Sequence, residues 1–310
     1  MCAATCACAA DTFPSRPLRL IVPFPPGGGT DIMARMVGQR LTDAFGVQVV
    51  VDNRGGASGI IGTDLAAKAN PDGHTMMIGS VSTICINASL HKKLPFDPEK
   101  DLAPVSLVAS TPSMLVVGNT IAAKSVKELI ALAKARPGQL HYASPGSGSS
   151  AHLGGELFKQ AAGIDIQHVP YKGTGPAVTD LVSGQVSMFI TNMPSVLPMV
   201  KANRLRPLAV TSLQRSALVP DLPTVAESGI PGFEVVVWYG LFAPAATPRP
   251  IIVRVNQEVR KMSGMQDVRD RLSVQGAEVM SSTPEELAKR VRDDLVKWGR
   301  IVKASGARVD

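Results

Sequence analysis

The sequence is poor in aromatic residues and cysteines and has no long hydrophobic run, and each shortage excludes a class of protein. Only 4% of its 310 residues are aromatic, too few for the stacking surfaces that bind single-stranded nucleic acid. No apolar run approaches the ~20 residues that span a bilayer. Three of the four cysteines lie within the first eight residues, so Cys85 has no partner for an internal disulfide in the mature domain.

The composition is that of a folded globular protein. Hydrophobic residues make up 45% of the chain and charged residues 18%, which excludes a disordered chain. The length corresponds to about two domains of roughly 150 residues. The net charge is +7, but the basic residues are scattered, and in residues 254–303 they are interleaved with acidic ones. We therefore expect a solvated surface that modestly favours anionic ligands, and no nucleic-acid interface.

Residues 1–12 are small and almost uncharged, and the alanine- and cysteine-rich stretch ends just before Asp11. This pattern is typical of the cleavage end of a secretory signal. We interpret the segment as a signal-peptide remnant or a disordered tail. The disordered start of a cytosolic protein is the alternative.

Short runs rich in valine and isoleucine alternate with amphipathic stretches along most of the chain. This alternation predicts βαβ units on parallel sheets. The expected strands are 18–23, 47–51, 75–78, 105–117 (broken at Pro112), 140–143, 166–169, 186–190, 205–210 and 235–242. The expected helices are 31–45, 59–68, 125–135, 150–162, 176–183 and 195–202, followed by a helical tail.

The order of these elements predicts two α/β lobes. The helical tail has no strands for a sheet of its own, so we expect it to pack on the first lobe. Residues 13–107 and 233–310 then form the first lobe and residues 108–232 the second, and the chain crosses between them twice. A ligand would bind in the cleft between the lobes, at the carboxyl ends of the strands.

The first candidate binding motif is residues 23–31, between a strand and a helix. Its prolines stiffen the approach, and its three glycines expose their amides where a helix begins. A helix N-terminus with free amides attracts anions. The motif lacks the lysine of a Walker sequence, and Ile32 stands where a dinucleotide-binding fingerprint has its last glycine. The alternative is a plain tight turn with Asp31 as the helix N-cap.

The second candidate motif, residues 144–150, repeats this pattern in the other lobe. It lacks the closing glycine of a hydrolase nucleophile elbow. We interpret His152, one turn into the following helix, as a hydrogen-bonding residue at the helix start rather than a catalytic base. Two anion-binding loops on opposite lobes predict a clamp.

Other strand-to-helix loops are weaker candidates. In residues 168–176, Tyr171 could line a cleft and Lys172 could face solvent or an anion. Asn192 follows a strand and could donate a hydrogen bond to a ligand. We interpret Arg54, in a further glycine loop, as a structural hydrogen-bonding residue. The five histidines show no metal-ligand spacing, and Cys85 is expected to be a small buried hydrophobe.

Taken together, these motifs resemble the Bug (TctC-type) solute receptors of tripartite tricarboxylate transporters. The resemblance runs from about Pro14 to the C-terminus and is carried by residues 23–31, 144–153, 171–173, 222–224 and 238–244. It implies a two-lobed periplasmic binding protein of type II with two crossover strands. It also implies that backbone amides and waters at the first loop hold a small carboxylate. Thr191 stands where many relatives have an acidic residue, so ligand selectivity does not carry over.

We therefore predict a periplasmic receptor for a dicarboxylate, a tricarboxylate or an acidic amino acid. We expect a monomer that serves transporter subunits in the membrane, with no enzymatic activity, metal, cofactor or nucleic acid. An effector-sensing protein of a regulatory system is the alternative. Asp31 would either meet a ligand ammonium group or only hold its loop. The predicted ligand-binding residues are Phe24, Gly27, Gly28, Gly29, Thr30, Asp31, Ser82, Thr83, Ser147, Gly148, Ser149, His152, Tyr171, Thr191 and Asn192.

Overall fold

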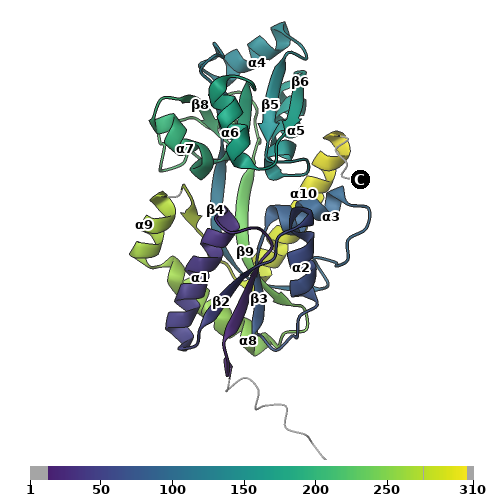
Figure 1. The fold of residues 1–310 in the computed structure, drawn as a ribbon, viewed down its shortest axis with the longest axis vertical. Coiled ribbons are helices and arrows are strands. Elements are labelled where there is room, and N and C mark those ends of the chain that lie inside the picture. The colour runs from purple at the N-terminus through teal and green to yellow at the C-terminus, as the bar shows by residue number, and fades with distance from the viewer. Residues whose placement is uncertain (1–12, 275, 306–310) are drawn as a thin grey trace, which may run out of the picture.

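The computed structural model describes residues 13–274 and 276–305. The predicted signal remnant, residues 1–12, lies outside the described residues. Two α/β lobes, one above the other in Figure 1, are joined by two long strands, as the sequence predicts. No helix in the described ranges combines the length and the apolar character needed to cross a membrane.

The first lobe is built on three parallel strands. β1 (Leu18–Val22) lies between β2 (Val49–Asn53) and β3 (Thr75–Ser80). β1 forms because its apolar run is almost wholly buried, as expected for the central strand of a parallel sheet. The helices of this lobe are α1 (Gly29–Phe45), α2 (Ile60–Ala67) and α3 (Asn87–Leu90). A 3-10 turn at Ala57–Gly59 precedes α2, and a π-helical segment at Ser82–Ile86 leads into α3.

The second lobe repeats the arrangement. β5 (Leu140–Ser144) pairs in parallel with β6 (Ile166–Pro170) on one side and with β7 (Met188–Asn192) on the other. Its remaining elements are α4 (Val126–Ala135), α5 (Ser150–Ala162), α6 (Thr174–Ser183), α7 (Met193–Lys201) and β8 (Leu205–Val210). The crossover strands pair antiparallel with each parallel unit, so the complete sheet is mixed.

The two crossover strands are β4 (Leu102–Gly118) and β9 (Val236–Pro244). The predicted break at Pro112 is wrong, because β4 runs through it as one strand of 17 residues. β4 pairs with β9 up to Pro112 and with β7 from Ser113 onward. Proline has no N–H to donate, and it stands where β4 changes partner, so the ladder tolerates it. The division of the sequence into residues 13–107 with 233–310 and residues 108–232 remains a prediction.

The C-terminal segment packs on the first lobe, as expected. α8 (Arg249–Ser263) contacts α1 and β4, and α10 (Pro284–Ser305) contacts α3 and β4. Between them lie α9 (Gln266–Val274) and the two-residue strand β10 (Glu278–Val279), which pairs with β4 and which the sequence did not indicate. α10 also contacts α5 of the second lobe.

Candidate functional site

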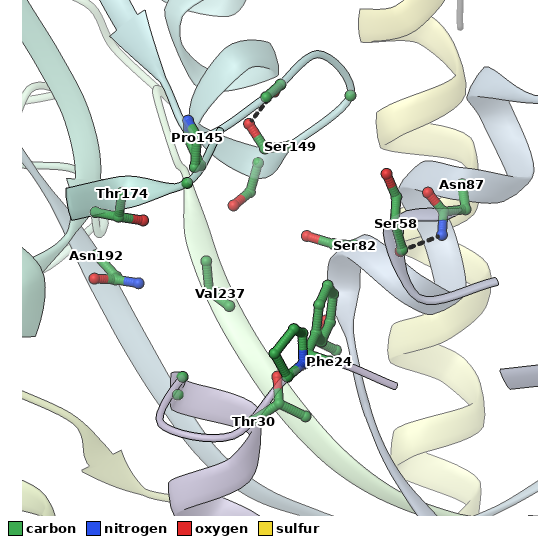
Figure 2. Close-up of a pocket in the computed structure, with 18 of the residues that line it drawn as sticks. Phe24, Thr30, Ser58, Ser82, Asn87, Pro145, Ser149, Thr174, Asn192 and Val237 are labelled. Atoms are coloured by element: carbon green, nitrogen blue, oxygen red, sulfur yellow. Dashed lines mark hydrogen bonds between the residues drawn. The ribbon is translucent and has the colours of Figure 1, made fainter. Parts of the chain in front are cut away.

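A cavity of about 560 Å³ lies between the lobes, where the loops after the parallel strands converge (Figure 2). Both lobes contribute to its wall, and none of its lining residues has a charged side chain. The lining residues are Phe24, Pro25, Pro26, Gly28, Gly29, Thr30, Ser58, Ser80, Ser82, Asn87, Pro145, Gly146, Ser147, Gly148, Ser149, Ser150, Gly173, Thr174, Asn192, Val237 and Tyr239.

The first-lobe loop, residues 23–31, presents the start of α1 to this cavity. Gly28 is the N-cap, and the first intrahelical hydrogen bond runs from the Ile32 amide to the Gly28 carbonyl (3.1 Å). The amides that precede this bond have no partner within the helix and form the positive end of its dipole. A side chain at Gly29 would overlap the Tyr239 hydroxyl, so only glycine lets α1 approach β9 this closely.

Asp31 holds the first-lobe loop from inside. Its buried carboxylate accepts hydrogen bonds from the Gly27 amide (3.0 Å), Arg35 Nε (3.0 Å) and Asn53 Nδ2 (3.0 Å). Burial raises the pKa of Asp31, but these hydrogen bonds outweigh it and hold the pKa below its usual value. The interpretation of Asp31 as the N-cap is wrong by three positions, because the helix begins at Gly29.

The second-lobe loop, residues 144–150, presents the start of α5 in the same way. Ser149 is the N-cap, and its hydroxyl accepts from the His152 amide (3.2 Å) and donates to the Gly146 carbonyl (2.7 Å). The Gly148 amide donates to His152 Nδ1 (3.1 Å). His152 therefore acts as the predicted hydrogen-bonding residue at the helix start, and it lies behind the loop rather than in the cavity wall.

Two histidines stack beneath this loop. The ring centroids of His152 and His168 are 4.0 Å apart, and the Tyr142 ring stacks with His168 at 5.0 Å and with His152 at 6.5 Å. Ser144 Oγ lies 2.7 Å from His168 Nε2. Burial, together with the neighbouring His152, lowers the pKa of His168 to about 4. Burial also lowers the pKa of His152, opposed by Glu156. Both rings are therefore neutral near pH 7.

A third wall comes from the turn before α2, in a glycine loop where the sequence singled out only Arg54. Ser58 adopts a left-handed conformation (φ 54°) that non-glycine residues rarely occupy. Asn87 Nδ2 donates to the Ser58 carbonyl (3.0 Å), and Figure 2 shows the two residues together at one side of the cavity. Arg54 lies outside the lining, and its Nε pairs with Asp52 (2.9 Å), which fits its structural interpretation.

The structure brings nine of the fifteen predicted ligand-binding residues to the cavity. They are Phe24, Gly28, Gly29, Thr30, Ser82, Ser147, Gly148, Ser149 and Asn192. The other six, which do not line it, are Gly27, Asp31, Thr83, His152, Tyr171 and Thr191. Sequence reasoning missed Ser58, Ser80, Asn87, Val237 and Tyr239 as lining residues. Ligand contact itself stays a prediction for each residue.

The residues outside the lining have visible structural partners. The Tyr171 hydroxyl donates to Asp180 (2.8 Å), and burial with this bond raises the pKa of Tyr171 to about 12. The Thr83 hydroxyl accepts a hydrogen bond from the Ser80 amide (2.9 Å) and supports the end of β3. Thr191 and Asn192 are successive residues of β7, which point to opposite faces, so only Asn192 reaches the cavity. Lys172 is also absent from the lining.

Neither metal ligands nor a reactive thiol contribute to the cavity. Across residues 13–274 and 276–305, no three His, Cys, Asp or Glu side chains gather closely enough to hold a metal ion. Cys85 is fully buried, as expected, and burial raises the pKa of its thiol. The chemistry offered to a ligand is therefore that of backbone amides, hydroxyls, the Asn192 and Asn87 amides and the Tyr239 phenol.

Comparison with known proteins decides the family. The family profile described as "Tripartite tricarboxylate transporter family receptor" matches residues 33–307. The chain belongs to this family. Protein BugT of Bordetella pertussis is 42% identical over 301 residues, which cover 97% of this chain and 92% of BugT. The resemblance to the Bug (TctC-type) receptors is thus confirmed, and these are periplasmic solute-binding proteins of transport systems.

Solved structures of two relatives in the receptor family hold carboxylates. The R. palustris protein Rpa4515, solved with adipate, is 36% identical, has a TM-score of 0.88, and is matched over 96% of this chain and 100% of its own. MatC from Rhodopseudomonas palustris, solved with bound malate, is 33% identical, with a TM-score of 0.82 and coverage of 94% and 100%. The two-lobed periplasmic binding fold is therefore shared with both.

Proposed function

We propose that this receptor captures a small carboxylate in the interlobe cavity and presents it to the membrane subunits of a tripartite tricarboxylate transporter. The ligand would be a dicarboxylate, a tricarboxylate or an acidic amino acid. The receptor would act in the periplasm as a monomer and release its ligand unchanged. Family membership and the adipate and malate named for two relatives support this proposal.

The observation that carries the proposal is the convergence of helix N-termini from both lobes on one uncharged cavity. The starts of α1, α5 and α6 contribute Gly29, Ser150 and Thr174 to the lining. Each N-terminus offers free amides and roughly half a positive charge from the helix dipole. A carboxylate in the cavity would meet positive potential on both sides without a guanidinium or ammonium partner.

Lobe closure would bring the two sets of amides onto one ligand. The lobes are connected through β4 and β9, and bending of such connections closes periplasmic binding proteins around their ligands. Small-angle X-ray scattering should therefore give a smaller radius of gyration with ligand than without. Unchanged scattering from a preparation shown to be ligand-free would contradict closure.

Turnover is not part of the proposal. The two histidines nearest the cavity lie behind the second-lobe loop, with His152 Nδ1 and His168 Nε2 engaged in hydrogen bonds to that loop and its strand. His152 Nδ1 accepts from the Gly148 amide, so this nitrogen cannot take a proton from a nucleophile in the cavity without giving up its loop contact. Asp31 is likewise committed to three donors, so we infer that it positions the loop rather than binding a ligand ammonium group.

A thermal-shift panel of malate, succinate, adipate, citrate, aspartate and glutamate tests the function. A ligand at 100 times its Kd adds about 2.7 kcal/mol to the free energy of unfolding, so at least one compound should clearly raise Tm. Tricarballylamide, the uncharged amide counterpart of a tricarboxylate, serves as the control and should give no rise. The absence of a rise with every carboxylate, or steady product formation from one of them, would contradict the proposal.

A further inference from the structure

A second chamber of about 410 Å³ adjoins the interlobe cavity. The two spaces share a wall formed by Gly28, Gly29, Thr174, Asn192 and Tyr239. Each lies within the ~300–1,000 Å³ that is typical of small-molecule pockets. A ligand held at the start of α1 therefore has room to extend past this shared wall.

The second chamber differs from the interlobe cavity in the chemistry of its wall. Ile32 and Met33 of α1, Pro194 of α7 and Ala277 line it, and no lining residue has a charged side chain. Neither the α5 N-terminus nor the serine-rich loop before it reaches this chamber. The segment before Ala277 approaches α7 closely, because a Cβ at Gly276 would lie 3.2 Å from Pro194 Cδ.

Part of the polar lining of the second chamber is already engaged or held uncharged. Burial raises the pKa of Tyr239 to about 12, so its phenol stays uncharged. The Ser195 amide and hydroxyl both donate to Asn192 Oδ1. Asn192 thereby turns its amide nitrogen toward the interlobe cavity (Figure 2). The side chains of Ile32, Met33, Pro194 and Ala277 supply the apolar part of the wall that a ligand can contact in the second chamber.

We propose that the second chamber binds the hydrocarbon part of a carboxylate whose charged group is held in the interlobe cavity. This narrows the proposed ligand class to carboxylates with an apolar extension and away from its compact, fully polar members. This inference rests on the proposed function. Burial of the extension against Ile32 and Met33 supplies affinity that uncharged amides alone do not provide.

Calorimetry with butanoate, hexanoate and octanoate tests the inference on the purified full chain. Each additional methylene that enters the second chamber should lower Kd by about four-fold. Octanedioate serves as the matched ligand with a second charge. It should bind more weakly than octanoate, because its far carboxylate would be buried without a cation.

Variants at Ile32 test whether the hydrocarbon chain of the ligand lies in the second chamber. Ile32→Phe fills the second chamber and Ile32→Asn makes its wall polar, so both should remove the gain from butanoate to octanoate and leave butanoate affinity within about two-fold. Retained butanoate binding shows that each variant is folded. Ile61→Phe and Ile61→Asn are the matched controls, because Ile61 lies 56% exposed on α2 outside both spaces. They should keep the full chain-length dependence.

The outcomes separate this inference from the proposed function. Butanoate binding with no gain from longer chains would overturn the second-chamber inference alone. A gain that persists in both Ile32 variants would place the tail elsewhere and overturn it too. Tighter binding of octanedioate than octanoate would make the chamber a second carboxylate site instead. If no carboxylate of any length bound, including those of the thermal-shift panel, the proposed function itself would fail.

Discussion

The two loops that face each other across the cavity are held in shape by different chemistry. In the first lobe, a buried and ionised carboxylate, Asp31, gathers the loop amide of Gly27 and the side chains of Arg35 and Asn53. In the second lobe, neutral groups do this work, namely the Ser149 hydroxyl and the His152 imidazole beneath the loop. Both arrangements leave the first amides of a helix free for a ligand.

This difference shows that helix N-termini can offer their positive ends to a ligand without any charged side chain in the cavity wall. The Asp31 charge is satisfied behind its loop, and the second lobe avoids an ionised anchor altogether. The two anchors should therefore respond differently to truncation and to acid. The following predictions use that contrast, beginning with the largest effect.

Asp31→Ala should give the largest loss. It leaves the Gly27 amide without its acceptor and Asn53 Nδ2 with only the Phe24 carbonyl, which should lower the free energy of unfolding by about 2–3 kcal/mol in urea titrations. Carboxylate affinity should fall by at least about ten-fold, because the amides at the start of α1 lose their fixed position. By the same reasoning, Asp31→Asn should weaken amino acids and plain carboxylates equally. Selective loss of amino-acid binding would instead assign Asp31 an ammonium contact.

Asp293→Ala is the matched control for this variant. Asp293 pairs with Lys289 four residues earlier on α10, as Asp31 pairs with Arg35 four residues later on α1, but both members of the control pair are exposed. Exposed pairs of this kind contribute about 0–1 kcal/mol. Equal destabilisation by the two substitutions would show that burial and the loop contacts of Asp31 do not matter.

Acid should affect the second lobe before the first. The folded pKa of His168, about 4, lies below the ordinary value of 6.5, so the unfolded chain binds more protons between these two values. Its contribution to stability is therefore complete above pH 6.5 and is lost as the pH falls toward 4. The pKa of Asp31 is also lowered, so its contribution is lost only below its ordinary value of 3.8.

Thermal melts from pH 7 to pH 4 measure this effect. Wild-type Tm should fall in this window by less than Asp31→Ala lowers it at pH 7, and His168→Gln should reduce the pH-dependent part. His91→Gln, outside the stack of His152, His168 and Tyr142, is the control and should keep the wild-type slope. A Tm that stays constant down to pH 4 would contradict the neutral-stack interpretation.

The smallest effect is expected at the helix cap. Ser149→Ala should lower stability by about 1 kcal/mol, and Ser149→Gly by only a few tenths of that unit. Ser125, the N-cap of α4, accepts from the Glu128 amide (3.2 Å) in the same lobe but away from the cavity. Ser125→Ala should cost similar stability and leave carboxylate affinity unchanged, whereas Ser149→Ala should weaken both. Equal affinities for the two variants would remove Ser149 from the site.

The fold was predictable where local pattern and burial agree. The runs at β1 and β5, and the helices that follow the glycine loops, are apolar at the spacing their structure needs, and the family motifs fix their order. The error at Pro112 came from reading proline as a strand breaker. Only the sheet shows that β4 changes partner at this residue, where its missing N–H is tolerated.

The site was predictable only in part, because much of its wall depends on contacts between distant segments. The sequence around Ser58 gives no sign of a contact with Asn87. Asn87, 29 residues away, donates to the Ser58 carbonyl and stabilises the left-handed backbone there. Tyr239 enters the cavity because a crossover strand passes behind Gly29. Because successive strand residues point to opposite faces, only one of Thr191 and Asn192 could have been predicted to face the cleft. The sequence alone does not show which face of β7 that is.

The C-terminal helix offers a way to measure the opening and closing of the lobes. α10 is fixed to β9, since Trp238 Nε1 donates to Asp294 (2.5 Å), and it also reaches α5 in the other lobe (Figure 1). Any separation of the lobes must slide or break the contact between α10 and α5. A pair of fluorescent labels on these two helices would therefore report opening and closing while leaving the cavity wall untouched.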